Sequence, residues 1–512
     1  MASACGHLGR RAEAAAAVRD LLALDPEFAA HARSYVGTWH FASGLMDPIL
    51  EGLRKAGLSI PENGSSDSPR RNGTVTAKVD RVESCTDSGK VQAEEGFRVA
   101  VLPFEYSGNN ADLTALAEGL TEEIVTGLSR FSYLKVISRS STSRYAHESV
   151  DVRSAGKELG ARYVMEGSLR QAGTKLRLAV QLVDAVSGAH LWAENYERIF
   201  SPEAVFELQD ELVPRIVSTV ADMNGVLPRS MSETVRSRTP EEVSPYEAVL
   251  RSFGYFERVT AEELAAAQSG LELAVRKAPA YADAWAMLAV LCVQEHAQGF
   301  NLQADPLTSG AIAARRAVEA APSNHLAYFS LAQALFFQKE FQAFRNAAER
   351  AVALNPMDGN SIAFLGDLLT WAGDWDRGLA LAGRAKQLNP HHPGWYWIAD
   401  FYNAYRQGDY RGALSFAHKI NMPGHWFAPA AIAAAYGQLG ELGAATKALR
   451  DLLKLRPDFA ATVRKQMEKW GPPEFLERMI DGWRKAGLKI ADAERMADRS
   501  SFRETPASPA PK

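Results

Sequence analysis

The chain has 512 residues, of which 46% are hydrophobic and 23% are charged, a composition typical of globular proteins that allows two or three domains. The net charge of −4 gives no electrostatic reason to expect nucleic acid or an anionic membrane as a partner. The sequence has three widely separated cysteines, no CxxC pair and no apolar run of about 18 residues, which argues against a disulfide framework, a zinc site and a membrane span.

The first residues of the chain do not resemble a secretory signal. Arg10, Arg11 and Glu13 interrupt the apolar core that a signal peptide needs. Together with the low cysteine content, this pattern predicts a cytoplasmic protein.

Residues 1–60 repeat a pattern that returns near the end of the chain. "GHLGRRAEAAAAVRDLLALDPEFAAHAR" at 6–33 aligns with "GQLGELGAATKALRDLLKLRPDFAATVR" at 437–464, and "EGLRKAGLSI" at 51–60 aligns with "DGWRKAGLKI" at 481–490. We interpret residues 1–60 as a helical fragment that resembles the C-terminal repeat and its cap. Three alternatives stay open for this fragment: docking on the body of the chain, docking on a second copy to form a homo-oligomer, or a relic of gene fusion.

Residues 61–96 separate this fragment from the rest of the chain. They are rich in Ser, Gly, Asp, Glu and Lys and contain almost no aliphatic side chains. Such a composition cannot bury enough apolar surface to offset the entropy of the chain, so we predict a disordered linker. We also predict a disordered tail at residues 491–512.

An α/β pattern begins at residue 97. The apolar run "RVAVLPF" predicts a buried strand, and the segment at 112–131 predicts an amphipathic helix because its apolar residues recur at helical spacing. These apolar residues are Leu113, Leu116, Leu120, Ile124 and Leu128. A strand at 134–138, a helix at 151–161 and three antiparallel strands follow, and the middle strand alternates apolar and polar residues. The predicted order is β-α-β-α-β-β-β, an α/β domain over residues 97–222.

Several stretches of this domain resemble the TolB-like amino-terminal domain of bacterial signalling proteins. They are "VAVLPF", "LAEGLTEEIVTGLSRF", "LKVISRSSTSRY", "LGARYVMEGSLRQAGTKLRLAVQLVDAVSGAHLWAENYER" and "VFELQDELVPRIV". The resemblance implies a module without catalytic activity that lies between an output domain and tetratricopeptide repeats. The usual outputs are class III adenylate or guanylate cyclase, winged-helix DNA-binding or Ser/Thr kinase domains.

Prolines recur at nearly constant distance in the second half of the chain. Their successive gaps are 34, 43, 34, 34, 33 and 34 residues, for Pro245, Pro279, Pro322, Pro356, Pro390, Pro423 and Pro457. Because proline cannot continue a helix interior, each one marks the end of a repeated helical unit. We expect the longer unit to carry about nine extra residues around "GFNLQADPLTSG".

The period and the phase of small residues resemble the tetratricopeptide repeat, a helix–turn–helix unit. Ten residues after the prolines stand Ala289, Ala332, Gly366, Asp400 and Ala433, and only Asp400 is not small. The sequence therefore predicts a multidomain protein, with an α/β TolB-like domain followed by an all-α tetratricopeptide-repeat solenoid and C-terminal cap over residues 223–490.

The sequence contains no recognisable catalytic, cofactor-binding or metal-binding motif, so we expect no enzyme activity, no cofactor and no metal. The segment around Gly156 and Lys157 lacks the rest of a phosphate-binding loop. The histidines near residues 391–425 show no helical i, i+4 pair, so we interpret them as ordinary surface residues rather than zinc ligands.

The first helices of stacked repeats line a concave face, which we expect to bind a protein or an extended peptide. The predicted groove is rich in aromatic residues, which anchor many protein interfaces. Its residues are Phe329, Gln333, Phe336, Phe337, Asn360, Asp367, Trp371, Trp397, Phe401, Tyr405 and Phe427.

These features favour a non-catalytic interaction and signalling scaffold of a bacterial regulatory system. One alternative is the orphan regulatory half of a class III adenylate cyclase-type protein. Another is a transcriptional regulator that lacks its DNA-binding domain, since residues 1–97 contain no helix-turn-helix with basic recognition residues.

Overall fold

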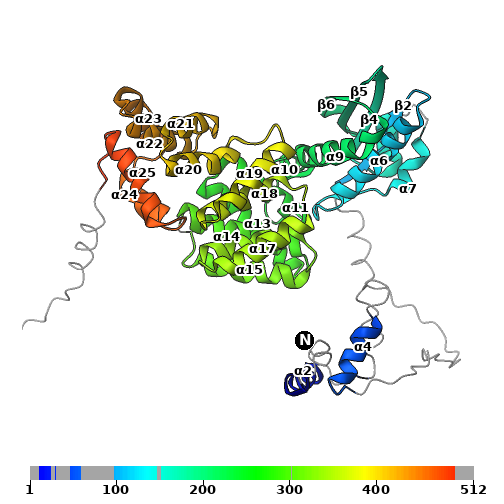
Figure 1. The fold of residues 1–512 in the computed structure, drawn as a ribbon, viewed down its shortest axis with the longest axis horizontal. Helices are drawn as coiled ribbons and strands as arrows, with labels where there is room; N and C mark the ends of the chain where they lie inside the picture. The colour runs from blue at the N-terminus through cyan, green and yellow to red at the C-terminus, as the bar shows by residue number, and fades with distance from the viewer. Residues whose placement is uncertain are drawn as a thin grey trace, which may run out of the picture. The chain divides into compact units, whose positions relative to one another are not determined.

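The computed structural model describes residues 11–24, 29, 46–58, 97–146, 151–300 and 302–490. They belong to two compact units, Met1–Cys85 and Thr86–Lys512 (Figure 1). The segments predicted to be disordered, 61–96 and 491–512, lie outside the described residues. None of the helices in the described part of the chain is long and apolar enough to cross a membrane.

The first unit contains the helices α2 (Arg11–Leu24) and α4 (Met46–Lys55). Small and aliphatic side chains form its core, namely Ala14, Val18, Leu50, Leu53, Ala56 and Leu58. Their spacing along each helix is the three-to-four-residue spacing of a helical face that packs against a neighbour.

The end of α4 has the same geometry as the end of the last helix of the chain, α25 (Pro473–Lys485). Gly57 has φ +97° and Gly487 has φ +103°, a region that favours glycine. The Leu58 amide donates to the carbonyl of Leu53 at 3.1 Å, and the Leu488 amide donates to that of Trp483 at 2.9 Å. The sequence similarity between the two stretches thus extends to the same helix-terminating turn.

The second unit begins with a mixed sheet in the order β3-β1-β4-β5-β6. β1 is parallel to both β3 and β4, β4-β5-β6 form an antiparallel meander, and β2 is parallel to β4. The strands are β1 (Arg98–Val101), β2 (Glu105–Tyr106), β3 (Lys135–Val136), β4 (Tyr163–Ala172), β5 (Lys175–Asp184) and β6 (Ala189–Ile199). The predicted strand order along the chain and the meander are confirmed, and β2 is an additional short strand.

Helices cover both faces of this sheet. One face packs on α6 and α9 through the alternating residues Leu176, Leu178, Val180 and Leu182, all 2% exposed or less. The other face carries a smaller core that includes Ala155 of α8 and Tyr145. The helical elements of this domain are α6 (Ala111–Leu128), α7 (Arg139–Thr142), η1 (Ser143–Tyr145), α8 (Val152–Leu159), η2 (Pro202–Ala204) and α9 (Val205–Ala221).

Helical hairpins follow the sheet domain. They are formed by α11 (Pro245–Phe253) with α13 (Ala261–Lys277), α14 (Ala282–Gln298) with α15 (Pro306–Ala320), α16 (His325–Phe337) with α17 (Phe341–Leu354), α18 (Gly359–Trp371) with α19 (Trp375–Leu388), α20 (Ile398–Gln407) with α21 (Tyr410–Lys419), and α22 (Phe427–Leu439) with α23 (Leu442–Leu455). The other elements are α10 (Val226–Val235), α12 (Tyr255–Arg258), η3 (Gly394–Trp397) and α24 (Phe459–Met467), and α25 packs on α22. The result is a sheet domain joined to a helical solenoid.

Six of the seven repeating prolines follow the second helix of a hairpin, as the sequence predicts, whereas Pro245 is the first residue of α11. Pro356, for example, stands two residues after α17 ends and three residues before α18 begins. The nine extra residues of the long unit are spread over it: relative to the α16–α17 hairpin, α14 is longer by four residues, the loop by four and α15 by one. They are therefore not confined to the loop.

The small residues predicted at helix crossings do lie at close contacts. A Cβ atom added to Gly366 would come within 2.8 Å of the carbonyl oxygen of Gly378 on the partner helix. Asp400, the exception in the pattern, lies instead beside Lys386 and forms an ion pair with it.

The sheet domain and the helical repeats share one apolar core that extends from Val99 to Ile490. Hydrogen bonds cross between the two parts: the Tyr246 hydroxyl of α11 donates to the Tyr133 carbonyl of the sheet domain at 3.0 Å. The Ser132 hydroxyl donates to Asp283 Oδ1 at 2.7 Å. These contacts make the two parts one packed body.

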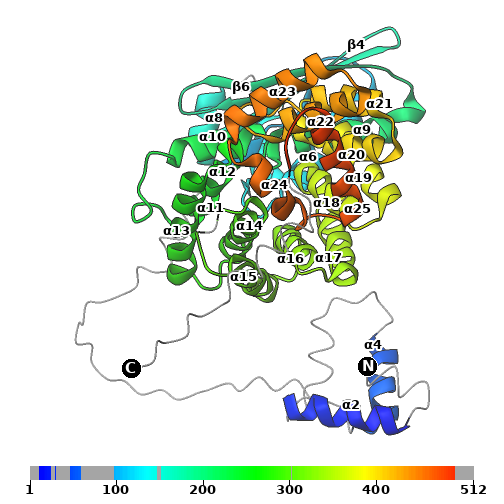
Figure 2. The ribbon, with the colours of Figure 1, turned by 90° about the vertical axis from the view of Figure 1, so that its left-hand side faces the viewer.

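The C-terminal part of the solenoid returns to its beginning. Lys469 Nζ donates to the His296 carbonyl at 2.6 Å, and Gln466 donates to the Ala297 carbonyl. The rings of Phe337 and Trp470 pack edge to face with their centroids 5.0 Å apart. Figure 2 shows α24 next to α14, which agrees with these contacts. The segment from α24 to Trp470 consequently forms part of the wall of the inner surface of the repeats.

Candidate functional site

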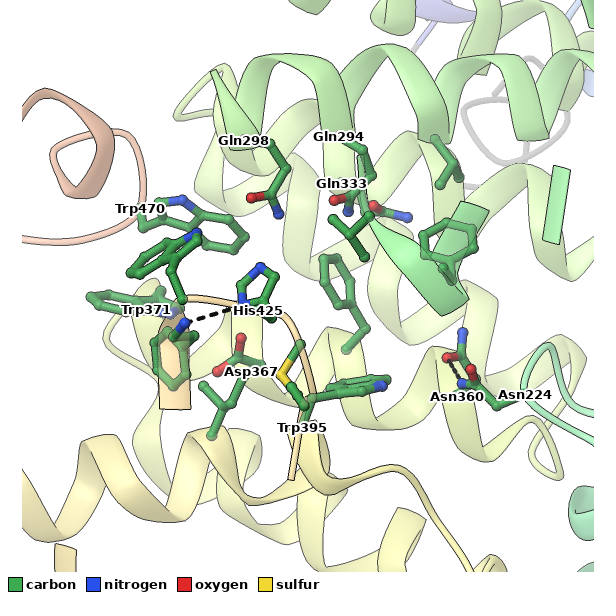
Figure 3. A pocket seen from close by; sticks show the side chains of 18 of the residues that line it. Asn224, Gln294, Gln298, Gln333, Asn360, Asp367, Trp371, Trp395, His425 and Trp470 are labelled. Atoms are coloured by element: carbon green, nitrogen blue, oxygen red, sulfur yellow. Dashed lines mark hydrogen bonds between the residues drawn. The ribbon is translucent and has the colours of Figure 1, made fainter. Parts of the chain in front are cut away.

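The inner surface of the repeats contains a cavity of about 160 Å³ that opens to solvent (Figure 3). The first helices of successive hairpins, α14, α16, α18, α20 and α22, supply most of its walls, and α24 and the segment after α9 complete them. Because each first helix presents one face inward, residues far apart in the sequence, such as Gln294 of α14 and Tyr402 of α20, line the same space.

Aromatic side chains are the largest group among the residues of the wall. Trp371 and Tyr402 pack edge to face with ring centroids 4.4 Å apart, and Phe427 lies 5.7 Å from Tyr402. The aromatic lining residues are Phe256, Phe329, Phe364, Trp371, Trp395, Tyr402, Trp426, Phe427 and Trp470. Edge-to-face pairs of this kind fix ring orientations and leave π faces and ring edges toward the space between them.

Three polar side chains in the wall are buried and lack hydrogen-bond partners within the described part of the chain. They are Gln333, through both its amide nitrogen and oxygen, Asp367, through Oδ1, and Trp371, through Nε1. Gln333 is 0% exposed, Asp367 is 7% exposed and Trp371 is 6% exposed. An unpaired buried polar group costs roughly 1–3 kcal/mol, so three of them around one cavity are typical of a binding site rather than of a core.

Burial raises the pKa of the Asp367 carboxyl to about 7. Burial lowers the pKa of His425 to about 4, and Arg456 contributes to that shift, so the imidazole is neutral at physiological pH. None of the described lining residues is Lys or Arg. Asp367 is therefore the one lining group that can carry charge near neutral pH.

Two hydrogen bonds join residues of the wall to one another. Asn224 Nδ2 donates to Asn360 Oδ1 at 2.6 Å, and the Phe427 amide donates to His425 Nδ1 at 3.2 Å, both drawn as dashed lines in Figure 3. Figure 3 also shows Gln294, Gln298 and Gln333 together along one wall.

Six residues of the predicted groove line the cavity, namely Phe329, Gln333, Asn360, Asp367, Trp371 and Phe427. The others do not. Phe336 is 0% exposed and packs edge to face on Phe344 of its own hairpin, with ring centroids 5.5 Å apart, and Phe337 packs on Trp470 behind the wall.

In the α20 repeat, the residues predicted to line the groove face away from the cavity. Phe401 and Tyr405 are 0% exposed in the core, and Trp397 lies outside the cavity between the ammonium groups of Lys386 and Lys419, 4.1 and 4.2 Å from its ring centroid. The helical segment of this repeat begins at Gly394, four residues after Pro390, whereas α18 begins three residues after Pro356, a delay of one residue or roughly 100° of helical phase. Tyr402 consequently takes the lining position expected for Phe401.

Sequence reasoning also missed lining residues of α14. Val290 and Gln294 stand 11 and 15 residues after Pro279, the same offsets that place Asp367 and Trp371 after Pro356. The offset from the proline thus also identifies these two lining residues, but the irregular length of the α14–α15 unit makes the offset hard to recognise in the sequence. Trp470 lies beyond the last regular repeat position, and no periodic signal marks it.

The histidines singled out in the sequence do not converge. His392 stacks on Tyr396 with ring centroids 4.9 Å apart, and His391 lies 3.8 Å from the Glu194 carboxylate. No three His, Cys, Asp or Glu side chains in the described part of the chain lie close enough together to hold a metal ion.

Comparison with known protein families gives a match at residues 95–215. It is to the family described as "HilA/YgeH-like transcriptional regulator, second domain". The matched residues correspond to the sheet domain and most of α9. The description differs from the TolB-like family that the sequence resembles, so that finer assignment stays a prediction.

Two further comparisons concern whole proteins. A Rhizobium meliloti (strain 1021) protein named "Putative adenylate cyclase 3" is 31% identical over 250 residues, which are 49% of this chain and 42% of that protein. The chain thus matches less than half of the length of this relative. A solved tetratricopeptide repeat protein from Parabacteroides merdae ATCC 43184 is 16% identical to this chain. The match covers 50% of this chain and 96% of the solved chain, with a TM-score of 0.31. At that TM-score the likeness carries no argument, and the repeat architecture described above is derived from the hairpins of this chain.

Proposed function

We propose that the chain is a non-catalytic regulatory module of a bacterial signalling system, which binds a protein partner in the cytoplasm. Its TolB-like sheet domain would span residues 97–222 and its tetratricopeptide repeats residues 223–490. Helix–turn–helix solenoids commonly act as binding surfaces, because their stacked first and second helices expose long continuous faces.

The observation that carries this proposal is the shared core of the sheet domain and the repeats. Tyr133 contributes to both parts, because its hydroxyl donates to the Ala221 carbonyl and its ring packs on Phe253 with centroids 4.9 Å apart. A rigid connection of this kind transmits a binding event in one part to the other, as a regulatory module requires.

The comparisons support a regulatory role and are compatible with two kinds of output domain. The relative named as an adenylate cyclase favours the regulatory half of a cyclase system, with catalysis on another polypeptide or segment. The match to a transcriptional-regulator domain favours control of a DNA-binding output. A segment similar to proteins named for two different outputs is best explained as the part that these proteins share.

Crosslinking of the chain in its native cell, followed by mass spectrometry, tests the proposal. We expect crosslinks from the sheet domain or the repeats to a second protein that carries a cyclase, kinase or DNA-binding domain. The purified chain should form no cyclic nucleotide from ATP or GTP with Mg²⁺ or Mn²⁺. Turnover by the purified chain, or crosslinks confined to the chain itself, would contradict the proposal.

Two exposed apolar side chains on the sheet domain can be replaced to test whether a partner binds there. Ile199 at the end of β6 and Phe206 at the start of α9 are each 77% exposed. The double variant Ile199→Ser and Phe206→Ser should reduce crosslinks to a partner of the sheet domain without lowering the melting temperature. Leu442→Ser, at a 62% exposed position on α23, is the control for a change of surface hydrophobicity.

A further inference from the structure

The geometry points to a binding site for a small organic cation, an ammonium group on an apolar body about the size of one aromatic ring, in the cavity lined by α14, α16, α18, α20 and α22. This inference concerns a ligand of the cavity and stands independently of the protein partner proposed above. It depends on the charge, the aromatic lining and the volume of the cavity.

The charge of the wall selects the sign of the ligand. Asp367 projects into the cavity from α18, and its Oδ1 has no hydrogen-bond partner in the described part of the chain. No Lys or Arg stands among the described lining residues, and His425 is neutral at physiological pH because burial lowers its pKa to about 4. An ammonium group would supply the missing donor and the missing positive charge together, which stabilises a buried carboxylate.

The aromatic wall suits the same ligand. Trp371, whose indole edge reaches the cavity, stands four residues from Asp367, so both lie on one face of α18. Tyr402 packs on Trp371 and Phe427 packs on Tyr402, and the three rings form one side of the cavity. Ring faces attract cations, and a carboxylate set among aromatic rings is a common arrangement for ammonium recognition.

A buried amide on the α16 side of the cavity predicts a second polar group on the ligand. The amide of Gln333 is fully buried and has no partner for its nitrogen or oxygen in the described part of the chain. It comes from α16, and in Figure 3 it lies across the cavity from Asp367. A ligand with its cation toward Asp367 and a hydroxyl or carbonyl toward Gln333 would satisfy both side chains.

The volume limits the size of the ligand. The cavity measures about 160 Å³, close to the roughly 150 Å³ of an engineered protein cavity that binds benzene. An extended peptide needs far more room than this. The cavity therefore fits one ring-sized molecule rather than the extended peptide predicted for the groove.

Isothermal titration of the full-length chain with matched probes tests the site. The cations are benzylammonium, phenethylammonium, tyramine and benzyltrimethylammonium, the neutral analogue is 2-phenylethanol, and the anionic analogue is 3-phenylpropionate. At about pH 8, where a carboxyl with a pKa near 7 is mostly ionised, we expect at least one cation to bind about tenfold more tightly than 2-phenylethanol. The anion should not bind measurably.

The variant Asp367→Asn keeps the side-chain shape and removes the charge. It should reduce the preference for the cation over 2-phenylethanol to less than about twofold, because the charge-assisted interaction is lost. Asp374→Asn is the matched control: it removes one charge from the turn between α18 and α19, and Asp374 does not line the cavity. It should leave both affinities unchanged.

Any one of three results would overturn the inference. The first is that none of the four cations binds the wild-type chain, the second is that the cations and the neutral analogue bind equally well, and the third is that Asp367→Asn keeps the full preference for the cation. Should Asp367→Asn fail to fold, the comparison of cation, neutral and anionic probes on the wild-type chain decides the question alone.

Discussion

The Nε2 atom of His325 lies 3.3 Å from Oδ2 of Asp358, and both side chains are 2% exposed. His325 is the first residue of α16, and Asp358 precedes α18 and accepts a hydrogen bond from the Ser361 amide at 3.1 Å. The rings of Phe131 and Tyr133 from the sheet domain lie 5.7 and 6.5 Å from the His325 ring. This pair therefore connects two successive repeats at the place where the sheet domain is packed on them.

Replacing Asp358 should destabilise the chain strongly. Asp358→Ala removes the N-cap of α18 and leaves His325 without its buried partner, so we expect the free energy of unfolding to fall by about 2–4 kcal/mol. Urea denaturation measures the change. The exposed Asp376→Ala in the first turn of α19 serves as the control and should change it by less than about 0.5 kcal/mol. A small effect of Asp358→Ala would mean that the repeats do not depend on this connection.

A second buried carboxyl nearby makes stability depend on pH. Burial, with a contribution from the charge of Asp358, raises the pKa of Asp222 from 3.8 to about 7. The folded chain then holds a proton that the unfolded chain releases, so stability falls as the pH rises from about 4 to about 7.

The variant Asp222→Asn removes this pH dependence. It should melt at the same temperature as the wild-type chain near pH 4 and at a higher temperature near pH 8, where its free energy of unfolding should be larger by about 4 kcal/mol at most. Differential scanning calorimetry at both pH values measures it. The exposed Asp112→Asn is the control and should show no such trend. A destabilised Asp222→Asn variant at pH 8 would contradict the buried-acid interpretation.

Two glycines in one hairpin should respond in opposite directions to the same substitution. Gly366→Ala places a methyl group within 2.8 Å of the Gly378 carbonyl oxygen, and such overpacking destabilises by about 1–3 kcal/mol. Gly383, in α19, has no atom within 4 Å of an added Cβ, so Gly383→Ala should stabilise the helix by about 0.5–1 kcal/mol. Chemical denaturation of the two variants distinguishes close helix packing from general intolerance of the hairpin to alanine.

The sequence predicts the repeats well because their physical signals are local. Each proline stops a helix wherever it stands, and small residues such as Gly366 are required wherever two helix backbones approach closely. The alternation from Leu176 to Leu182 likewise predicts a half-buried strand from the side-chain geometry of strands alone. These features do not depend on knowledge of the rest of the fold.

The cavity is less predictable because it depends on long-range contacts. Gln333 and Asp367 follow from the phase of their helices, but the contact of Lys469 with His296, which helps to form the wall of the inner surface, has no counterpart in any local pattern. The helical segment of this repeat begins one residue later after its proline than α18 does, and Tyr402 rather than Phe401 lies in the wall. A small change in helical phase thus decides which aromatic side chain faces a ligand.

The proposal for function depends most on the sheet domain and the repeats acting as one body, and native-state hydrogen exchange of two variants tests this directly. Tyr133→Ala removes a 1% exposed ring and the hydroxyl bonded to Ala221 at the junction, and Tyr145→Ala removes a 7% exposed tyrosine on the other face of the sheet. We predict that Tyr133→Ala accelerates amide exchange in β4, α11 and α16 together, by an amount that corresponds to about 3 kcal/mol, whereas Tyr145→Ala affects the sheet domain alone. Faster exchange confined to the sheet domain in Tyr133→Ala would contradict the rigid coupling on which the proposed regulatory role depends.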